Sequence, residues 1–286
     1  MTIFDLTRAH ALRQQPAAQR WLIEDLWADE AVGIVGGEPK CCKSFLALGM
    51  AVSVAAGVPC LGRFPAAQTG PVLLFAAEDA LHVVRTRLHG ICLSAQVAFD
   101  SLDVHVITEP VVRLDAAADR DRLRESIEHV RPRLLILDPF VRLHRIDENA
   151  AAEVAPLLAY LRELQRSLHC AVALVHHARK GGHARAGQAL RGSSELHAWG
   201  DSNLYLRRQG ERLLLSTEHR AAASSATGLD LALSERGGGL ALHVCQDMPV
   251  SPEKPPPSPS ERILDALGGA SAFDARQNWA TCARQN

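Results

Sequence analysis

The sequence has no paired cysteine motif and no long apolar run. Its seven cysteines are scattered without a C-x-x-C pair, which argues against a structural zinc site or a disulfide framework and favours reduced thiols in the cytosol. The longest apolar stretch, residues 45–58, is too short to span a bilayer. No basic-apolar-small signal peptide opens the chain. We therefore expect a soluble, cytoplasmic protein with no membrane partner.

The sequence also lacks an excess of positive or negative residues. The 31 Lys and Arg residues are balanced by 32 Asp and Glu residues, so the formal net charge is −1. The chain as a whole therefore does not attract a polyanion, and any nucleic-acid contact must come from a local basic patch. Apolar content is high instead, at 47% of 286 residues. This composition suits one large α/β domain with an ample core and a small appendage.

A phosphate-binding pattern is present at residues 36–44, which read GGEPKCCKS. The spacing is that of G-x-x-x-x-G-K-[ST], except that Cys42 replaces the second glycine. In such a loop, backbone N–H groups cradle the phosphates, the lysine reaches the β- and γ-phosphates, and the hydroxyl holds Mg²⁺. We therefore predict ATP and Mg²⁺ as ligands. The predicted binding residues are Gly37, Glu38, Pro39, Lys40, Cys41, Cys42, Lys43 and Ser44.

The neighbouring segments favour this interpretation. Residues 31–35 are typical of a buried parallel strand, and residues 45–52 of a buried helix. Strand, glycine turn and helix is the order that a phosphate-binding loop requires, and the helix N-terminus adds its own attraction for anions. The alternative is a strand-to-helix turn that contains Lys-Ser by coincidence.

Cys42 is the departure from the pattern. Glycine at this position lets the backbone approach phosphate without a side-chain clash. A cysteine is expected to be tolerated if its φ is negative, since its N–H then remains available. Otherwise the cysteine would weaken nucleotide affinity, or make the site sensitive to oxidation through the vicinal thiol of Cys41.

Strand and helix patterns alternate along the rest of the sequence. This rhythm predicts a mostly parallel sheet with helices on both faces. Beyond residue 200, short strand patterns joined by turns predict antiparallel strands that continue the sheet. The expected strands are 71–75, 103–107, 133–138, 170–175, 202–207, 212–217, 229–233 and 240–244, and the expected helices are 79–92, 118–130 and 150–168.

We divide the chain into four parts. Residues 1–30 form a lead-in segment and residues 31–247 the ATPase domain. Residues 248–260 hold six prolines together with serines, a composition typical of a linker. Residues 261–286 are too few for a domain, and we interpret them as a short tail or a truncated module.

Acidic residues follow two of the predicted strands. Glu78 follows the strand at 71–75, where a carboxylate beside the strand of the phosphate loop would orient water for attack on the γ-phosphate. The alternative for Glu78, and the preferred interpretation of Asp79, is a helix N-terminal acid. Asp138 ends an apolar strand, as in a Walker B motif, which predicts an Mg²⁺-associated acid. Because Pro139 rather than a glutamate follows, the catalytic role is assigned to Glu78.

His176 and His177 end the strand predicted at 170–175. A polar residue there would contact the γ-phosphate and report its loss to the following loop; a structural role is the alternative. That loop, residues 178–193, is glycine-rich and has no acid or aromatic residue. It suits contact with a nucleic-acid backbone without base stacking, whereas a solvated surface loop is the alternative. Its basic residues are Arg179, Lys180, Arg185 and Arg191, and a smaller basic loop, residues 142–145, follows Asp138.

In combination, these motifs resemble a known family. The order GEPKxxKS, AED, LDPFVRLHR…ENA, LVHHARKG and LRGSS, over roughly residues 20–245, looks like that of the RepA-type ATPases of plasmids and phages. These are hexameric replicative helicases and their relatives. The resemblance implies a RecA-like P-loop NTPase core, with a mostly parallel sheet flanked by helices and with antiparallel strands at its C-terminal end.

The resemblance also implies roles for individual residues. Lys43 and Ser44 would bind phosphate and Mg²⁺, Glu78 would be the catalytic base, and Asp138 the Mg²⁺-associated acid. His176 and His177 would couple the γ-phosphate to the basic loop. In such rings an arginine near the end of a late strand reaches the nucleotide of the neighbouring subunit, and Arg220 occupies that place. A surface arginine is the alternative, because the family's lysine two positions earlier is Glu218 here.

The expected function is accordingly that of a Mg²⁺-dependent ATPase. It would form a homo-oligomeric ring, expected to be a hexamer, and act as a DNA helicase or a motor dependent on single-stranded DNA in plasmid, phage or mobile-element replication. One alternative is an ATP-gated DNA-binding or regulatory protein with little or no unwinding. Another is a small-molecule kinase, but no acceptor pocket or lid arginines are identified in the sequence.

Overall fold

The computed structural model describes residues 4–12, 20–177, 194–220 and 228–245. Its contacts divide the chain after Cys245, and the fold below is that of the unit ending there. The four basic residues of the predicted DNA-contacting loop, Arg179, Lys180, Arg185 and Arg191, lie outside the described residues, as do the predicted linker and tail.

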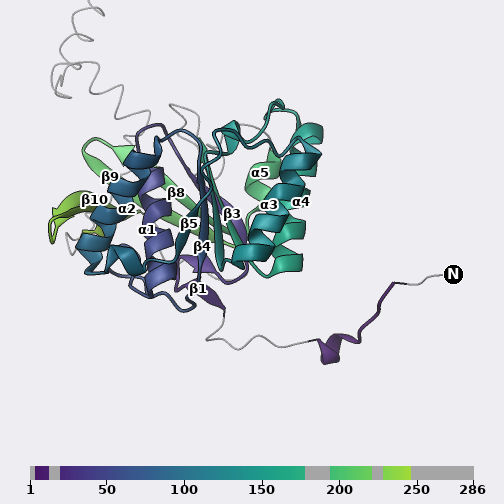
Figure 1. Ribbon diagram of the computed structural model, residues 1–286, viewed down its shortest axis with the longest axis horizontal. Helices are drawn as coiled ribbons and strands as arrows, with labels where there is room; N and C mark the ends of the chain where they lie inside the picture. Colours follow the sequence, from purple (N-terminus) through teal and green to yellow (C-terminus); the bar gives the residue numbers. More distant parts are fainter. Residues whose placement is uncertain (1–3, 13–19, 178–193, 221–227, 246–286) are drawn as a thin grey trace, which may run out of the picture. The chain divides into compact units, whose positions relative to one another are not determined.

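Nine strands of the described residues form one sheet, in the order β11-β10-β9-β8-β3-β7-β6-β4-β5. Figure 1 shows α1 and α2 on one side of the central strands and α3, α4 and α5 on the other. The six strands from β8 to β5 pair in parallel, and β9, β10 and β11 continue the sheet in antiparallel pairs. This arrangement confirms the predicted fold class. The strands are β3 (Val32–Gly37), β4 (Val72–Ala76), β5 (Val104–Val106), β6 (Leu134–Asp138), β7 (Ala171–His177), β8 (Ser202–Gln209), β9 (Arg212–His219), β10 (Leu229–Arg236) and β11 (Gly239–Val244).

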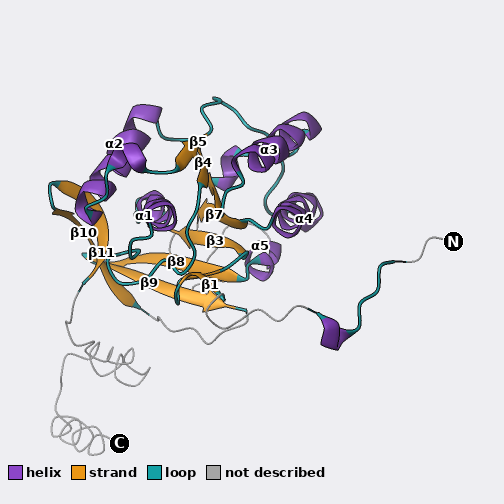
Figure 2. Cartoon of the chain, turned by 60° about the horizontal axis from the view of Figure 1, so that its bottom comes forward, coloured by secondary structure: helices purple, strands orange, loops and turns teal. Residues whose placement is uncertain are grey.

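Helices cover both faces of this sheet (Figure 2). Two of them, α1 (Lys43–Ala56) and α2 (Leu81–Ala95), pack on one face. On the other face lie α3 (Ala117–Val130), α4 (Ala151–Leu168) and the short α5 (Ser194–Trp199). None of the helices in the described part of the chain is long and apolar enough to cross a membrane.

Burial on both faces explains the continuous apolar strands. In β6, Leu134 and Ile136 join the core beneath α1 and α2, whereas Leu135 and Leu137 join the core beneath α3 and α4. Because successive side chains of a strand point to opposite faces, a strand covered on both sides needs an unbroken apolar run. The same run ends at Asp138, where the strand reaches the carboxyl edge of the sheet.

The structure corrects two expected strand relations. The strand preceding Glu78 is not beside the strand of the phosphate loop, because β7 and β6 lie between β3 and β4. The first strand beyond residue 200, β8, is not purely antiparallel: it pairs in parallel with β3 and antiparallel with β9. Both relations depend on pairing between distant segments, on which a local apolar pattern carries no information.

Three local features differ from the sequence expectations. The lead-in segment contains a small antiparallel pair, β1 (Trp21–Ile23) and β2 (Trp27–Ala28). Helix α2 begins at Leu81 rather than at residue 79, so that Glu78 lies in the turn before it. The short helix α5 was not predicted, because six residues are too few to show a helical repeat.

Candidate functional site

The loop between β3 and α1 begins where β3 ends at Gly37. Gly37 has a φ of 156°, and a Cβ built there would lie 2.3 Å from the carbonyl oxygen of Leu206 and 2.7 Å from Sγ of Cys41. This approach leaves room only for glycine. Helix α1 starts at Lys43, so Lys43 and Ser44 lie in its first turn, where the helix dipole favours an anion.

The side chain of Lys43 is turned into the loop and is 6% exposed. Its Nζ donates a hydrogen bond of 2.8 Å to the carbonyl oxygen of Glu38 and lies 3.9 Å from Sγ of Cys41. Burial lowers the pKa of Lys43, while Cys41 and the carboxylates of Asp138 and Glu78 act in the opposite direction. A desolvated ammonium of this kind gains from a phosphate anion, so the loop fits a nucleotide.

Asp138 faces Ser44 across the same edge. Burial raises the pKa of Asp138 to about 6, and the negative charge of Asp79 also raises it. The hydrogen bond with Ser44 lowers this pKa but does not offset the burial. The hydroxyl and the carboxylate are oxygen ligands of the kind that Mg²⁺ prefers. The described residues contain no group of three His, Cys, Asp or Glu side chains able to hold a metal. This donor set therefore fits Mg²⁺ bound together with phosphate, as is usual for that ion.

Glu78 lies in the turn after β4, beside Asp138. Ala76 pairs with Asp138 in the sheet, and the N–H of Ala77 donates to the carbonyl oxygen of Asp138 at 2.7 Å. The Nε of Arg142 donates to Oε1 of Glu78 at 3.0 Å, with the two side chains 61% and 44% exposed. Separating an exposed pair costs at most about 1 kcal/mol. Glu78 is therefore able to turn towards a bound phosphate.

Asp79 has a different role from that of its neighbour. It forms an ion pair with Arg87 of α2, whose guanidinium also lies 5.2 Å from the ring centroid of Phe45 in α1. The N-cap of α2 is Ala80 rather than Asp79, and it makes no side-chain capping bond. Asp79 thus connects the turn to the helix through Arg87 and not as a cap.

His176 and His177 pair with Gly36 and Gly37 in the parallel register of β3 and β7. Their backbone therefore lies beside the start of the phosphate loop, and the predicted contact with the γ-phosphate stays a prediction. His176 is buried against Phe140, with ring centroids 6.0 Å apart.

Glu148 joins this strand end to the loop that follows Asp138. Its Oε1 lies 3.3 Å from Nε2 of His144 and 4.0 Å from Nδ1 of His176. Burial raises the pKa of Glu148, but the two histidines, together with His177, more than offset this and lower the pKa overall. Sequence reasoning included Glu148 in the ENA segment but gave it no role, because only the folded loop brings it to β7.

Arg208 is a second residue at the site that sequence reasoning missed. Leu206 pairs with Gly37, so Arg207 and Arg208 extend past it at the edge that carries the phosphate loop. Burial raises the pKa of the Cys42 thiol, and the charge of Arg208 is the largest opposing influence. Arg208 therefore lies close to the loop, although no motif marks it.

Arg220 lies at the opposite edge of the sheet. Its N–H donates to the carbonyl oxygen of Asp201, whose own N–H donates to that of Val32 at the start of β3. The phosphate loop follows the other end of β3, roughly 17 Å along a strand of this length. Arg220 is 57% exposed, and its backbone lies at the end of β3 opposite the loop of its own chain. A role at the nucleotide of another chain stays a prediction.

The sequence matches the AAA domain family over residues 2–183. The chain belongs to this family. The match includes the phosphate loop, Glu78, Asp138, His176 and His177, whereas Arg208 and Arg220 lie beyond it.

Solved structures agree with the family on the fold. One solved ATPase domain superposes with a TM-score of 0.59 at 12% identity, covering 75% of this chain and 86% of that one. The KaiC-like protein PH0186 from Pyrococcus horikoshii OT3 has a TM-score of 0.54 at 13% identity, with coverage of 78% and 93%. These likenesses show the fold alone. With the family, they make this AAA domain protein a P-loop ATPase of RecA-like fold, which confirms the resemblance seen in the sequence.

Cys42 of this AAA domain protein adopts a left-handed backbone conformation. Its φ is 62° and its ψ is 24°, so the condition of a negative φ, under which a cysteine was expected to be tolerated, is not met. This conformation is open to glycine and costs about 1–2 kcal/mol for an L-residue. Cys42 is therefore accommodated as backbone strain.

Replacing Cys42 by glycine is expected to stabilise the protein by about 1 kcal/mol, because glycine adopts this conformation freely. ATP should also bind more tightly, since the Cβ no longer limits the approach of phosphate. Urea unfolding and nucleotide titration measure the two effects. Gln96→Gly is the matched control: Gln96 is an exposed C-cap residue with a φ of 58°. It should raise stability similarly without changing ATP affinity. A lower free energy of unfolding for Cys42→Gly than for the wild type would show that Cys42 is not strained.

Proposed function

We propose that this AAA domain protein is a Mg²⁺-dependent ATPase that assembles into a ring on single-stranded DNA, in plasmid, phage or mobile-element replication in the cytoplasm. The observation that carries the proposal is the convergence of Lys43, Ser44, Glu78 and Asp138 at one edge of the sheet. Two strands separate the strands that supply the loop and Glu78. Such a convergence is required for phosphoryl transfer and is not needed for a mere strand-to-helix turn.

Each residue has a distinct part in hydrolysis. Lys43 would pair with the β- and γ-phosphates, and Ser44 and Asp138 would hold Mg²⁺. A bound Mg²⁺ supplies charge neutralisation at the phosphate oxygens. Glu78 would orient the attacking water and accept its proton. His176, with Glu148 behind it, would respond to loss of the γ-phosphate and transmit this change into the loop that begins at residue 178.

The position of Arg220 supports a ring. Arg220 is exposed at the edge opposite the phosphate loop, so a role in hydrolysis requires the nucleotide of a second chain. Arg208, by contrast, extends at the edge of its own loop and would contact the nucleotide in cis. A closed ring, which we propose to be a hexamer, is the assembly in which every Arg220 meets a neighbouring site.

DNA binding rests on two basic loops. The loop after β7 carries Arg179, Lys180, Arg185 and Arg191, and the loop after β6 carries Arg142 and the exposed Arg145. Loops at strand ends beside the nucleotide suit coupling of hydrolysis to contact with a DNA backbone. The second candidate is an ATP-gated DNA-binding or regulatory protein with little unwinding. The Cβ of Cys42 favours it, because a loop that phosphate approaches less closely would turn over slowly.

ATP turnover measured with and without single-stranded DNA tests the proposal. We expect DNA to raise kcat severalfold and Lys43→Ala to abolish turnover in both conditions. The matched variant Arg179→Ala with Lys180→Ala should keep the basal rate and lose the stimulation. Strand displacement separates the two candidates: stimulated turnover without unwinding supports the regulatory protein. A strict monomer in gel filtration, with and without ATP, would contradict the ring.

A further inference from the structure

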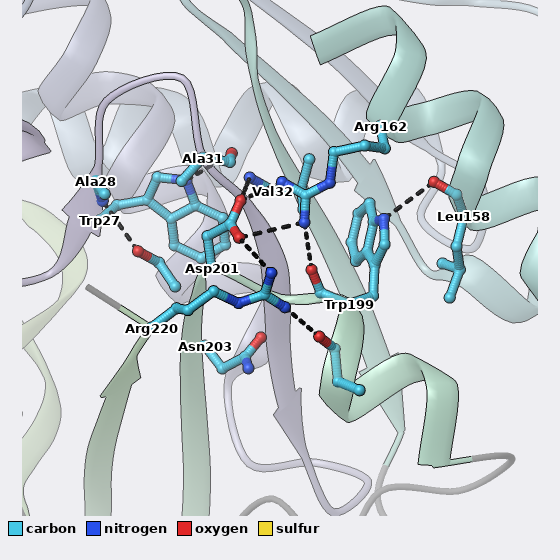
Figure 3. Close-up of polar contacts among 12 residues, drawn as sticks. Trp27, Ala28, Ala31, Val32, Leu158, Arg162, Trp199, Asp201, Asn203 and Arg220 are labelled. Atoms are coloured by element: carbon cyan, nitrogen blue, oxygen red, sulfur yellow. Dashed lines mark hydrogen bonds and ion pairs between the residues drawn. The ribbon is translucent and has the colours of Figure 1, made fainter. Parts of the chain in front are cut away.

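A second charged network lies at the amino edge of the sheet, away from the phosphate loop (Figure 3). Its centre is Asp201, between α5 and β8. Arg162 of α4 approaches both oxygens of this carboxylate, with one contact of 3.2 Å from Nη2 to Oδ1. The N–H of Val32 donates to Oδ2 at 3.4 Å. Asp201 therefore connects α4 to the first residue of β3.

Arg220 is held by the same aspartate. Its Nη1 lies 3.5 Å from Oδ1 of Asp201, and its Nη2 donates to the carbonyl oxygen of Ala198. Its backbone N–H donates to the carbonyl oxygen of Asp201 at 2.9 Å. Backbone and side chain are thus both fixed by the turn from α5 to β8. A guanidinium has more donors than these contacts use, so Arg220 retains donors for another partner.

Two further contacts join α4 and α5 beside the network. Nε1 of Trp199 donates to the carbonyl oxygen of Leu158 at 2.9 Å, and the guanidinium of Arg162 lies 5.8 Å from the Trp199 ring. Figure 3 shows Trp199 and Arg162 together on one side of Asp201 and Arg220 on the other. The aspartate therefore sits on a fixed base formed by α4 and α5.

The charges of the network do not balance. Two arginines face one aspartate, and Arg162 is 19% exposed, Asp201 25% and Arg220 57%. The bidentate Arg162 is the natural counter-charge of Asp201, so the charge of Arg220 is left over on the exposed side. The nearby acid Glu218 contacts His197, with 2.9 Å between Oε2 and Nε2, and forms no ion pair with Arg220 among the described residues. An uncompensated, fixed and exposed guanidinium fits an anionic partner.

We propose that Asp201 is the positioning residue of Arg220, with Arg162 as the counter-charge that lets Asp201 hold Arg220 without neutralising it. The anion is the γ-phosphate bound by a second copy of this chain, so the inference rests on the proposed function. The orientation of a catalytic guanidinium matters, because displacing a charged group by about 1 Å costs about 10²-fold in rate. A long arginine without an anchor would sample many directions.

The test is Asp201→Asn, which keeps the size of the side chain and removes its charge. We expect kcat for ATP hydrolysis to fall about 10–100-fold with ATP affinity unchanged, because the phosphate loop of the same chain is not touched. The matched control is Asp29→Asn. Asp29 pairs with Arg133 at 2.7 Å but not with Arg220, so its loss should leave kcat unchanged.

Mixing variants separates positioning from a merely structural effect. Lys43→Ala subunits have a defective phosphate loop and a correctly held Arg220. Asp201→Asn subunits have an intact phosphate loop and an Arg220 that is no longer held. Equimolar mixing should therefore restore turnover that neither variant shows alone. If Arg220→Ala with Lys43→Ala restores turnover and Asp201→Asn with Lys43→Ala does not, Asp201 is not the positioning residue. If the Arg220→Ala mixture also fails, the role of Arg220 in trans fails, and with it the ring mechanism.

Thermal melting identifies variants that do not fold. Should Asp201→Asn melt below the assay temperature, Asp201→Glu replaces it in the same mixing assay, because it keeps the charge and moves the carboxylate by one methylene. We expect a smaller loss of kcat, again restored by Lys43→Ala subunits. Wild-type kcat in a folded Asp201→Asn protein, or a kcat loss in Asp201→Glu that mixing does not restore, overturns the proposal.

Discussion

Replacing Arg220 by alanine is expected to lower kcat for ATP hydrolysis by about 10³-fold or more, the range found for arginines that act in trans. ATP affinity should not change, because Arg220 lies at the edge of the sheet opposite the phosphate loop of its own chain. The guanidinium would stabilise the charge that develops on the transferred phosphoryl group. Steady-state turnover and titration with a fluorescent ATP analogue measure the two quantities.

Arg212→Ala is the control for this experiment. Arg212 begins the strand that Arg220 follows, and its guanidinium pairs with Asp230. The side chain of Arg212 is 55% exposed and that of Arg220 57%. The two variants therefore both remove an exposed arginine from the same region. Its kcat should remain near that of the wild type. Loss of both ATP binding and hydrolysis in Arg220→Ala would instead indicate a role in the fold of its own chain.

Glu78→Gln should lower kcat by about 10²–10⁴-fold, the usual contribution of a general base. Glutamine keeps the size of the side chain and an acceptor for Arg142, but it cannot accept a proton from the attacking water. ATP should still bind, because Lys43 and Ser44 are unchanged. A trapped ATP complex, detected by nucleotide titration and by the absence of phosphate release, is the expected observation.

Asp79→Asn is the matched control for Glu78→Gln. Asp79 is the next residue and also an acid, but its partner is Arg87 of α2. We expect a much smaller loss of kcat than for Glu78→Gln. Hydrolysis at the wild-type rate in Glu78→Gln would remove Glu78 from the mechanism.

The loop illustrates how far local sequence reaches. Gly37, Lys43 and Ser44 were identified because a phosphate-binding loop needs particular residues at fixed spacing between a strand and a helix. The structure places all three at the end of β3 and in the first turn of α1. Asp138 was found in the same way, because an acid that ends a buried parallel strand lies at the carboxyl edge of the sheet. The strand and helix rhythm, set by apolar periodicity, predicted the layered fold.

Backbone conformation within that same loop was not predictable from these patterns. The sequence left open whether Cys42 has the negative φ under which it would be tolerated, and the structure shows a φ of 62°. The surrounding strand and helix hold the loop closely enough to outweigh a preference of about 1–2 kcal/mol. Local propensity is weaker than the packing of the two elements that the loop joins.

The sequence by itself therefore determined the class of fold, the phosphate loop and the acids at strand ends, since each depends on residues close together in the chain. Only the tertiary structure decided the order of the strands, and with it which residues share an edge. That order put Arg208 beside the loop, Glu148 beside His176, and Arg220 on Asp201 and far from its own loop. The physical reason is that sheet pairing joins segments far apart in sequence, and its register sets which side chains meet.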